Sequence, residues 1–164
     1  MRSFVQLAAV VASATLYGFS FPPDPWRTVA GMALVPLLLV LRTAPTGRAL
    51  LLTWIWTVAL GCVVNDWFPR TVAEYFGQGF AVGFVLFLGV CTFTCGVQVM
   101  AFALAYRHLL ARLSPATPLL TAAAWVTADM LRLLTFGGDP WALLGYSQVG
   151  RPTFSMIVTP DIQK

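Results

Sequence analysis

The run YFGQGFAVGFVLFLGVCTFTCGVQVMAFALAY, from Tyr75 to Tyr106, contains no charged side chain. Because roughly 20 helical residues span a bilayer core, this run is too long for one untilted span and too short for two. Gly77 and Gly79 lie near its start, and glycine is unfavourable inside a helix. We therefore predict an interfacial loop at the start, followed by a membrane helix from about Phe80 to Tyr106.

Four further runs of the sequence also lack charged residues and are candidate membrane helices. Three of them are short, but arginines or polar groups at their ends can snorkel to the interface. The sequence therefore predicts an all-α, polytopic transmembrane helix bundle with about five spans. A re-entrant or sixth element near residues 141–157 lacks the length to cross. The four runs are Ser3 to Pro23, Thr28 to Leu41, Ala49 to Asn65 and Leu113 to Ala128.

The composition of the 164-residue chain is also that of a membrane protein. Hydrophobic residues make up 59% of it and charged residues 10%, and the mean hydropathy is +0.80. Soluble globular domains carry about 25% charged residues. The net charge of +4 does not indicate nucleic-acid binding, because the arginines are scattered between apolar runs and form no basic cluster. We therefore predict no nucleic-acid partner.

The first apolar run has an alternative interpretation as a cleaved signal peptide. Arg2, a short apolar stretch and the small residues Ala12-Ser13-Ala14 resemble the parts of such a peptide. However, the hydrophobic stretch continues past this site to Phe21, which favours a retained membrane span.

The charged residues between the runs indicate how the helices are oriented. If the spans alternate, Arg2, the loop with Arg42 and Arg48, and the loop from Arg107 to Arg112 lie on one side of the membrane. The positive-inside rule makes this side cytoplasmic, so we predict a cytoplasmic N-terminus. All six acidic residues then fall on the opposite side, which is consistent with the span count: Asp24, Asp66, Glu74, Asp129, Asp139 and Asp161.

The segment between Asn65 and Glu74 joins two predicted spans on the extracytoplasmic side. It contains Trp67 and Phe68, and Tyr75 follows it directly. Aromatic residues of this kind gather at membrane interfaces. We predict an extracytoplasmic loop that carries part of an aromatic belt.

Cys91 and Cys95 lie four residues apart in the longest apolar run, so they share one face of the predicted helix. A metal site would need third and fourth ligands, and the neighbouring sequence offers none. We therefore predict that both cysteines pack against a neighbouring helix, and we predict no metal site.

The last predicted span runs into a segment rich in polar, aromatic, glycine and proline residues. Asp129 and Arg132 lie three residues apart, so they share one helical face and can pair, as ionisable groups near a bilayer usually do. Glycine and proline then end the helix. The segment reads Trp125-x3-Asp129-x2-Arg132, then Gly137-Gly138-Asp139-Pro140-Trp141, then Gly145-Tyr146-Ser147-Gln148.

This order and spacing closely resemble the membrane domain of the apolipoprotein N-acyltransferase family. A second patch, Phe21-Pro22-Pro23 with Trp26 and the run from Ala33 to Leu38, resembles the first loop and second span of that family. The chain departs from the family pattern at two positions. It has Asp129 where the family usually has Glu, and Asp139 where the family tends to have Phe.

The resemblance implies a transmembrane domain over residues 1–148, followed by a short tail over residues 149–164. In that family the chemistry belongs to a later nitrilase-like domain with a Glu, a Lys and a nucleophilic Cys, and the tail contains neither Glu nor Cys. The resemblance therefore implies a multi-pass protein of the bacterial inner membrane that is inactive as this chain alone, without catalytic residues or a cofactor of its own.

The family moves an acyl chain from an outer-leaflet phospholipid to the α-amino group of a lipid-modified N-terminal Cys on a lipoprotein. The implied partners are thus membrane phospholipid and, as further candidates, the lipoprotein substrate or a separate catalytic domain. The alternative is a stand-alone, non-catalytic membrane scaffold that binds lipid or a partner. Six residues are candidates for contact with lipid or the catalytic domain, or alternatively for anchoring the helix end: Trp125, Asp129, Arg132, Trp141, Tyr146 and Gln148.

Overall fold

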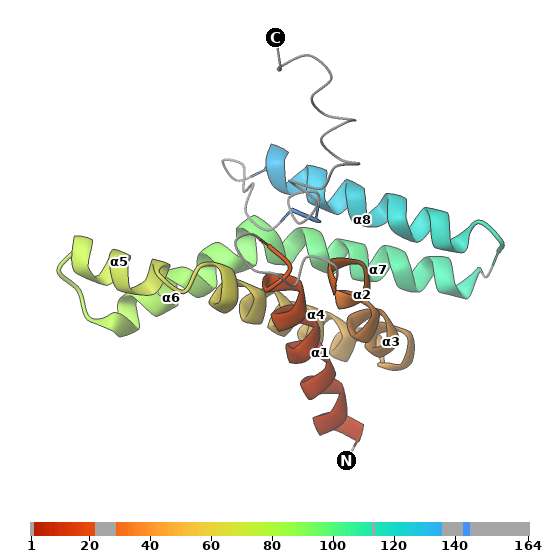
Figure 1. The fold of residues 1–164 in the computed structure, drawn as a ribbon, viewed down its shortest axis with the longest axis horizontal. Coiled ribbons are helices and arrows are strands. Elements are labelled where there is room, and N and C mark those ends of the chain that lie inside the picture. The colour runs from red at the N-terminus through yellow and green to blue at the C-terminus, as the bar shows by residue number, and fades with distance from the viewer. Residues whose placement is uncertain (1, 22–28, 113, 136–142, 145–164) are drawn as a thin grey trace, which may run out of the picture.

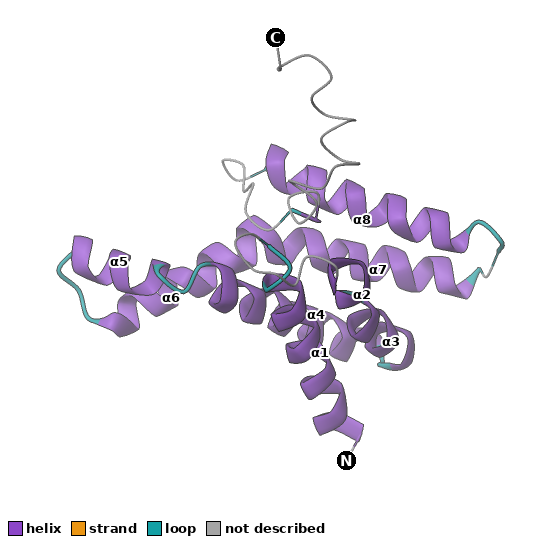
Figure 2. Cartoon of the chain, in the orientation of Figure 1, coloured by secondary structure: helices purple, strands orange, loops and turns teal. Residues whose placement is uncertain are grey.

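The computed structural model describes residues 2–21, 29–112, 114–135 and 143–144. Within these ranges every regular element is a helix, which confirms the predicted all-α class (Figure 1, Figure 2). In chain order the elements are α1 (Arg2–Gly18), α2 (Ala30–Ala33), α3 (Val35–Thr43), α4 (Thr46–Val64), α5 (Phe68–Tyr75), α6 (Phe80–Val90), the π-helical stretch η2 (Cys91–Gly96), α7 (Val97–Ala111) and α8 (Thr117–Leu134).

Two of these helices are long and apolar enough to cross a membrane. They are α4 and the continuous helix Phe80–Ala111, made of α6, η2 and α7, which begins at the predicted Phe80. α1 and the segment Ala30–Thr43 are apolar but shorter. The count of five spans stays a prediction, and the further element near residues 141–157 lies almost wholly outside the described residues.

The helices pack around α4, which contacts α1 on one side and α7 with η2 on the other (Figure 1). α8 runs along α7. The second apolar run is divided into α2 and α3 because Pro36 lacks an N–H group and its ring clashes with the preceding helical turn. α5 and α6 form a hairpin, hereafter the arm, that projects from the rest of the bundle.

Four aromatic side chains from four helices meet at the centre of the bundle. Tyr17 of α1 lies 5.3 Å from Trp56 of α4, measured between ring centroids, and Trp125 of α8 lies 6.0 Å from Trp56. Phe102 of α7 lies 4.9 Å from Trp125, with the two rings nearly perpendicular. Edge-to-face pairs of this kind are favourable beyond their burial. This aromatic cluster joins α1, α4, α7 and α8.

A buried polar relay ties the same region to α2. The indole nitrogen of Trp56 donates a hydrogen bond to Ser13 Oγ at 3.0 Å, and Ser13 Oγ donates to the carbonyl oxygen of Ala33 at 2.5 Å. Ser13 is fully buried. Interhelical hydrogen bonds of this type hold membrane helices together where hydrophobic driving force is weak.

The long helix contains one irregular stretch, the π-helical η2. Thr92 and Thr94 bond back to the carbonyl oxygens of Leu88 and Val90, at 2.7 and 2.9 Å. Trp54 of α4 donates a hydrogen bond to Thr92 Oγ1 at 2.9 Å. Threonine back-bonding of this kind bends helices. A contact with α4 therefore fixes the irregularity in place.

The Asn65–Glu74 segment, which we predicted as a loop, contains the helix α5, so this prediction was wrong. Pro69 stands in the first turn of α5, where its missing N–H is tolerated. Pro69 and Ala73 are buried on one face, while most of the other side chains face outward. The following Gly77 has a φ of 62°, which glycine adopts without strain, and this turn leads into α6.

The bundle has two chemically different ends. The basic end comprises the α3–α4 turn, the end of α7 and the start of α8, and it carries Arg42, Arg48, Arg107 and Arg112. Gln6 of α1 donates a hydrogen bond to Thr43 Oγ1 at 3.4 Å, so α1 begins at this end too. The opposite end contains the pocket described in the next subsection, and we call it the pocket end. The described acidic residues lie at or toward it: Asp66, Glu74 and Asp129.

The close approach of α5 and α6 generates a prediction for two glycines of α6. A side chain at Gly83 would collide with the backbone oxygen of Pro69, whereas a side chain at Gly89 would meet no atom within 4 Å. We expect Gly83→Ala to lower the free energy of unfolding by about 1–3 kcal/mol, the usual cost of overpacking. Unfolding in detergent micelles, followed by circular dichroism, measures the change.

Gly89→Ala is the matched control and is expected to cause no loss of stability, because alanine is the better helix former. Equal stability of the two variants would contradict the described contact between α5 and α6.

Candidate functional site

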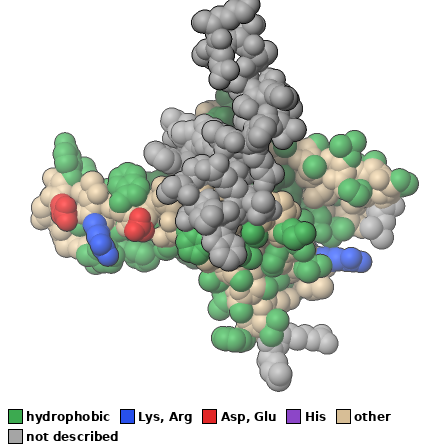
Figure 3. Space-filling model, in the orientation of Figure 1, with side chains coloured by type: hydrophobic (Ala, Val, Ile, Leu, Met, Phe, Trp, Pro, Cys, Tyr) green, Lys and Arg blue, Asp and Glu red, His purple; other side chains and the backbone are tan. Residues whose placement is uncertain are grey.

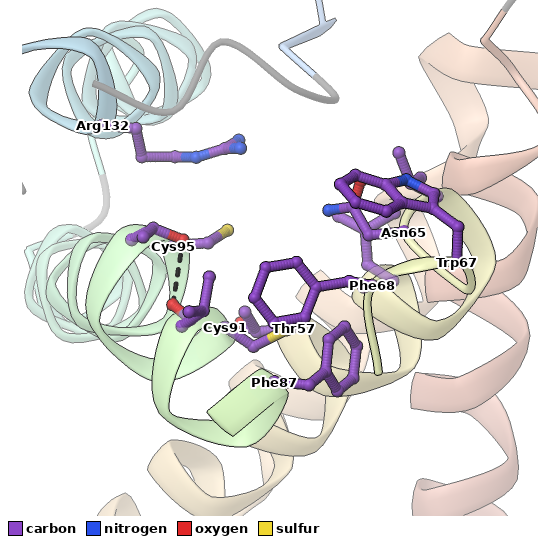
Figure 4. A pocket seen from close by; sticks show the side chains of 13 residues that line it. Thr57, Asn65, Trp67, Phe68, Phe87, Cys91, Cys95 and Arg132 are labelled. Carbon is purple, nitrogen blue, oxygen red and sulfur yellow. Dashed lines mark hydrogen bonds between the residues drawn. The ribbon is translucent and has the colours of Figure 1, made fainter. Parts of the chain in front are cut away.

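A pocket of about 230 Å³ lies at the pocket end, between the end of α4, the start of the arm, η2 and α8 (Figure 4). Its wall is mostly apolar. Trp67 and Val90 line it and are 49% and 40% exposed, so the pocket reaches the surface of the bundle. The lining residues are Thr57, Leu60, Gly61, Val64, Asn65, Trp67, Phe68, Phe87, Val90, Cys91, Thr94, Cys95 and Arg132.

The pocket keeps its shape through close contacts between α4 and the long helix. A side chain at Gly61 of α4 would lie 2.6 Å from Cys91 Sγ and 3.0 Å from the Phe87 ring. Cys91 and Cys95 are both buried, as the sequence predicted, and both line the pocket. Phe68 of α5 lies 6.2 Å from Phe87 of α6, measured between ring centroids. The arm thus forms one wall of the pocket.

Arg132 is the one charged side chain among the described residues that line the pocket. It comes from α8 and lies over the side of the pocket formed by Cys95 in Figure 4. Its Nη1 is 3.4 Å from Asp129 Oδ1, which confirms that these two residues pair. Both are buried, with exposed fractions of 3% for Arg132 and 7% for Asp129. A buried cation needs such a partner, because burying an isolated charge is very costly.

The pair is also connected to the chain beyond α8. The backbone N–H of Leu144 donates a hydrogen bond to Asp129 Oδ2 at 3.3 Å. A second hydrogen bond, from the side-chain amide of Gln98 in α7 to Thr135 Oγ1 at 2.7 Å, holds the end of α8 against α7. Asp129 therefore orients Arg132 and also holds the backbone of Leu144.

The polar groups of the pocket offer contacts to a ligand. Asn65 Oδ1 is buried and accepts no hydrogen bond from the described residues, so it offers an acceptor to a ligand. The hydroxyl of Thr57 donates to the carbonyl oxygen of Thr53 at 3.1 Å. Asp129 is engaged with Arg132. An apolar wall with a few placed polar groups is typical of a small-molecule site.

The six residues proposed from the sequence have different positions. Trp125 lies in the aromatic cluster and is 6% exposed, which favours its role as a helix anchor. Asp129 and Arg132 form the pair at the pocket. The other three fall outside the described residues: Trp141, Tyr146 and Gln148.

Comparisons with known proteins identify the family of the chain. The family described as the apolipoprotein N-acyltransferase N-terminal domain matches residues 13–159. The chain belongs to this family. Among similar proteins, the apolipoprotein N-acyltransferase of Haemophilus influenzae is 26% identical over 155 residues, which is 94% of this chain. That of Vibrio vulnificus is 28% identical over 90% of this chain, and that of Pasteurella multocida 24% over 81%. None of the solved structures compared matches the chain.

The chain spans well under half the length of these relatives. The matched part is 28% of the Haemophilus influenzae protein and 29% of the Vibrio vulnificus protein. Family membership therefore applies to the N-terminal domain of an apolipoprotein N-acyltransferase.

Most residues that line the pocket were missed by sequence reasoning, which named only Arg132 among them as a candidate site residue. Thr57 and Gly61 stand in a uniformly apolar helix, where the apolar pattern marks no inward face. Of these two residues, Gly61 could have predicted a close contact between helices, because small residues mark such contacts in membranes.

The buried pair generates a prediction that separates charge from packing. We expect Asp129→Leu to lower the free energy of unfolding by about 3–5 kcal/mol, because Arg132 would lose the carboxylate that compensates its charge. The double variant Asp129→Leu with Arg132→Met is expected to recover most of this loss. Unfolding in detergent micelles measures all three proteins.

Asp66→Ala, which removes an exposed acid, is the control and is expected to change stability by less than about 0.5 kcal/mol. A double variant that is no more stable than Asp129→Leu would show that Arg132 does not depend on Asp129.

Proposed function

We propose that this chain is the membrane domain of an apolipoprotein N-acyltransferase and that its pocket accepts part of a phospholipid acyl chain. The observation that carries the proposal is the position of Arg132, which is 3% exposed and lines a mostly apolar pocket that opens to the bundle surface. An acyl chain fits the apolar wall, and the guanidinium group is suited to the phosphate or ester oxygens of the same lipid.

The pocket is smaller than typical small-molecule sites. Its volume of about 230 Å³ is below the roughly 300–1,000 Å³ of such sites. It therefore holds one section of an acyl chain, and the rest of the lipid lies outside, beside Trp67 and Val90. This arrangement suits a domain that receives lipid from the surrounding bilayer.

The reaction we assign to the full-length protein is transfer of a phospholipid acyl chain to the α-amino group of a diacylglyceryl-Cys lipoprotein. The part matched by this chain is 28% of the Haemophilus influenzae relative. We assign the binding and positioning of lipid to this domain, and the chemistry to the remainder of the full-length protein. The alternative function is a stand-alone scaffold that binds lipid without any reaction.

We further propose a multi-pass arrangement in the bacterial inner membrane with the basic end in the cytoplasm. The four arginines of the basic end support this orientation under the positive-inside rule. The pocket end then lies at the outer leaflet.

A photoreactive phospholipid tests lipid binding at the pocket. We expect the purified chain to cross-link to an acyl-chain diazirine probe at Phe87 or Thr94 of the pocket wall, and the variant Val90→Trp to reduce cross-linking by filling the opening. Mass spectrometry of peptides locates the adducts. The same preparation is expected to transfer no acyl chain to a diacylated lipoprotein peptide, and measurable turnover would contradict the assignment of chemistry to residues outside this chain.

Val85→Trp is the matched control, because Val85 lies on the same helix, is 66% exposed and does not line the pocket. Equal cross-linking of both tryptophan variants would overturn the pocket assignment. A second preparation fuses to this chain the part of a full-length relative that follows the matched region. Cross-linking at the pocket without acyl transfer by this fusion would favour the scaffold function.

Engineered cysteines test the orientation. In a background with Cys62, Cys91 and Cys95 replaced by alanine, we expect Glu74→Cys to react with a membrane-impermeant maleimide added outside spheroplasts. Arg112→Cys is expected to react only after the membrane is opened. The opposite pattern would reverse the orientation.

A further inference from the structure

A second concave site lies at the basic end, away from the pocket. It is a shallow groove of about 290 Å³ between the end of α3 and the end of α7. Arg42 and Arg107 supply its polar side, and Leu41, Leu110 and Ala111 supply its apolar side. We call it the basic groove. The proposed function does not use it.

Arg107 is held in the basic groove by the chain that turns from α3 into α4. Its Nη1 donates hydrogen bonds to the carbonyl oxygens of Leu41 and Ala44, at 2.6 and 2.5 Å. Its Nη2 donates to Thr46 Oγ1 at 3.3 Å. These bonds use three of the five N–H donors of a guanidinium group, so two remain for a ligand. The group is therefore fixed in position before any ligand binds.

Arg42 stands on the other side of the basic groove and is exposed. Within the residues that the structure describes, the one ion pair is that of Asp129 with Arg132 at the pocket end, so Arg42 has no carboxylate partner there. Arg48 and Arg112 add positive charge at the same end. The electrostatic field at the basic groove thus favours an anion.

The surroundings of the basic groove indicate which anion. Val35 and Leu39 of α3 and Leu104 of α7 are 46%, 58% and 47% exposed, on the same helices and toward the middle of the bundle. Apolar side chains also form patches over the described part of the visible face in Figure 3, where few charged side chains appear. A ligand that fits both features has a phosphate and long apolar chains. Basic pockets between membrane helices bind such headgroups.

We propose that the basic groove binds the headgroup phosphate of an anionic phospholipid, with Arg42 and Arg107 contacting the phosphate and the acyl chains lying along α3 and α7. Guanidinium groups match phosphate oxygens in geometry, and two of them at one site favour an anionic over a zwitterionic headgroup. The inference rests on the proposed function only in treating the bundle as a membrane domain. If the proposed orientation is right, this lipid belongs to the cytoplasmic leaflet.

Lipid titration of the purified chain in detergent micelles, followed by native mass spectrometry, tests the proposal. We expect phosphatidylglycerol to bind more tightly than phosphatidylethanolamine. Arg42→Gln is expected to weaken phosphatidylglycerol binding by about fivefold, the usual contribution of one basic side chain at an anionic surface. Arg42→Lys is expected to retain most of the affinity, because it keeps the charge.

Arg70→Gln is the matched control, because Arg70 is exposed on α5 at the pocket end, and its binding of phosphatidylglycerol is expected to equal that of the parent chain. Circular dichroism verifies that each variant is folded. Equal affinity of Arg42→Gln and Arg70→Gln would overturn the proposal, as would equal binding of both phospholipids. Displacement of the lipid by millimolar inorganic phosphate would overturn it in favour of a free-anion site.

The two proposals can be contradicted separately. If the parent chain binds phosphatidylglycerol selectively but shows no photo-cross-linking at the pocket, the pocket assignment alone is contradicted. Intact cross-linking with no effect of Arg42→Gln would contradict the basic groove alone.

Discussion

The aromatic cluster of Tyr17, Trp56, Phe102 and Trp125 is the interaction on which the rest of this structure depends. Inside a bilayer the lipid is as apolar as the side chains, so helices associate through close packing and hydrogen bonds. The cluster supplies the packing for α1, α4, α7 and α8, and the relay through Ser13 supplies a directional bond at the same place. Each of these helices is thereby fixed in rotation as well as in position.

The rotation of α8 decides where its charged residues lie. Trp125, Asp129 and Arg132 follow one another at intervals of four and three residues, so they occupy one face of the helix. Once Trp125 is packed into the cluster, Asp129 and Arg132 must also face the interior. The pocket therefore acquires its cation because an aromatic side chain about two turns away on the same helix is buried.

The sequence predicted the features that depend on neighbouring residues and missed those that depend on distant ones. The start of the long helix at Phe80 followed from Gly77 and Gly79, and the buried pair followed from the spacing of Asp129 and Arg132. The helix α5 was missed because it is short, and because the burial of Pro69 and Ala73 depends on α6, which the local sequence does not reveal. The pocket was missed because three stretches far apart in sequence form it, residues 57–68, residues 87–95 and Arg132.

The π-helical stretch makes the long helix two separately oriented halves. Each residue of an α-helix turns the chain by about 100°, so the extra residue accommodated by η2 sets the face of α6 apart from that of α7. Phe87 and Val90 can thus line the pocket while Phe102 points into the aromatic cluster. Sequence drift in the arm can reshape the pocket and leave the aromatic cluster undisturbed, so the pocket and the core of the bundle are free to evolve at different rates.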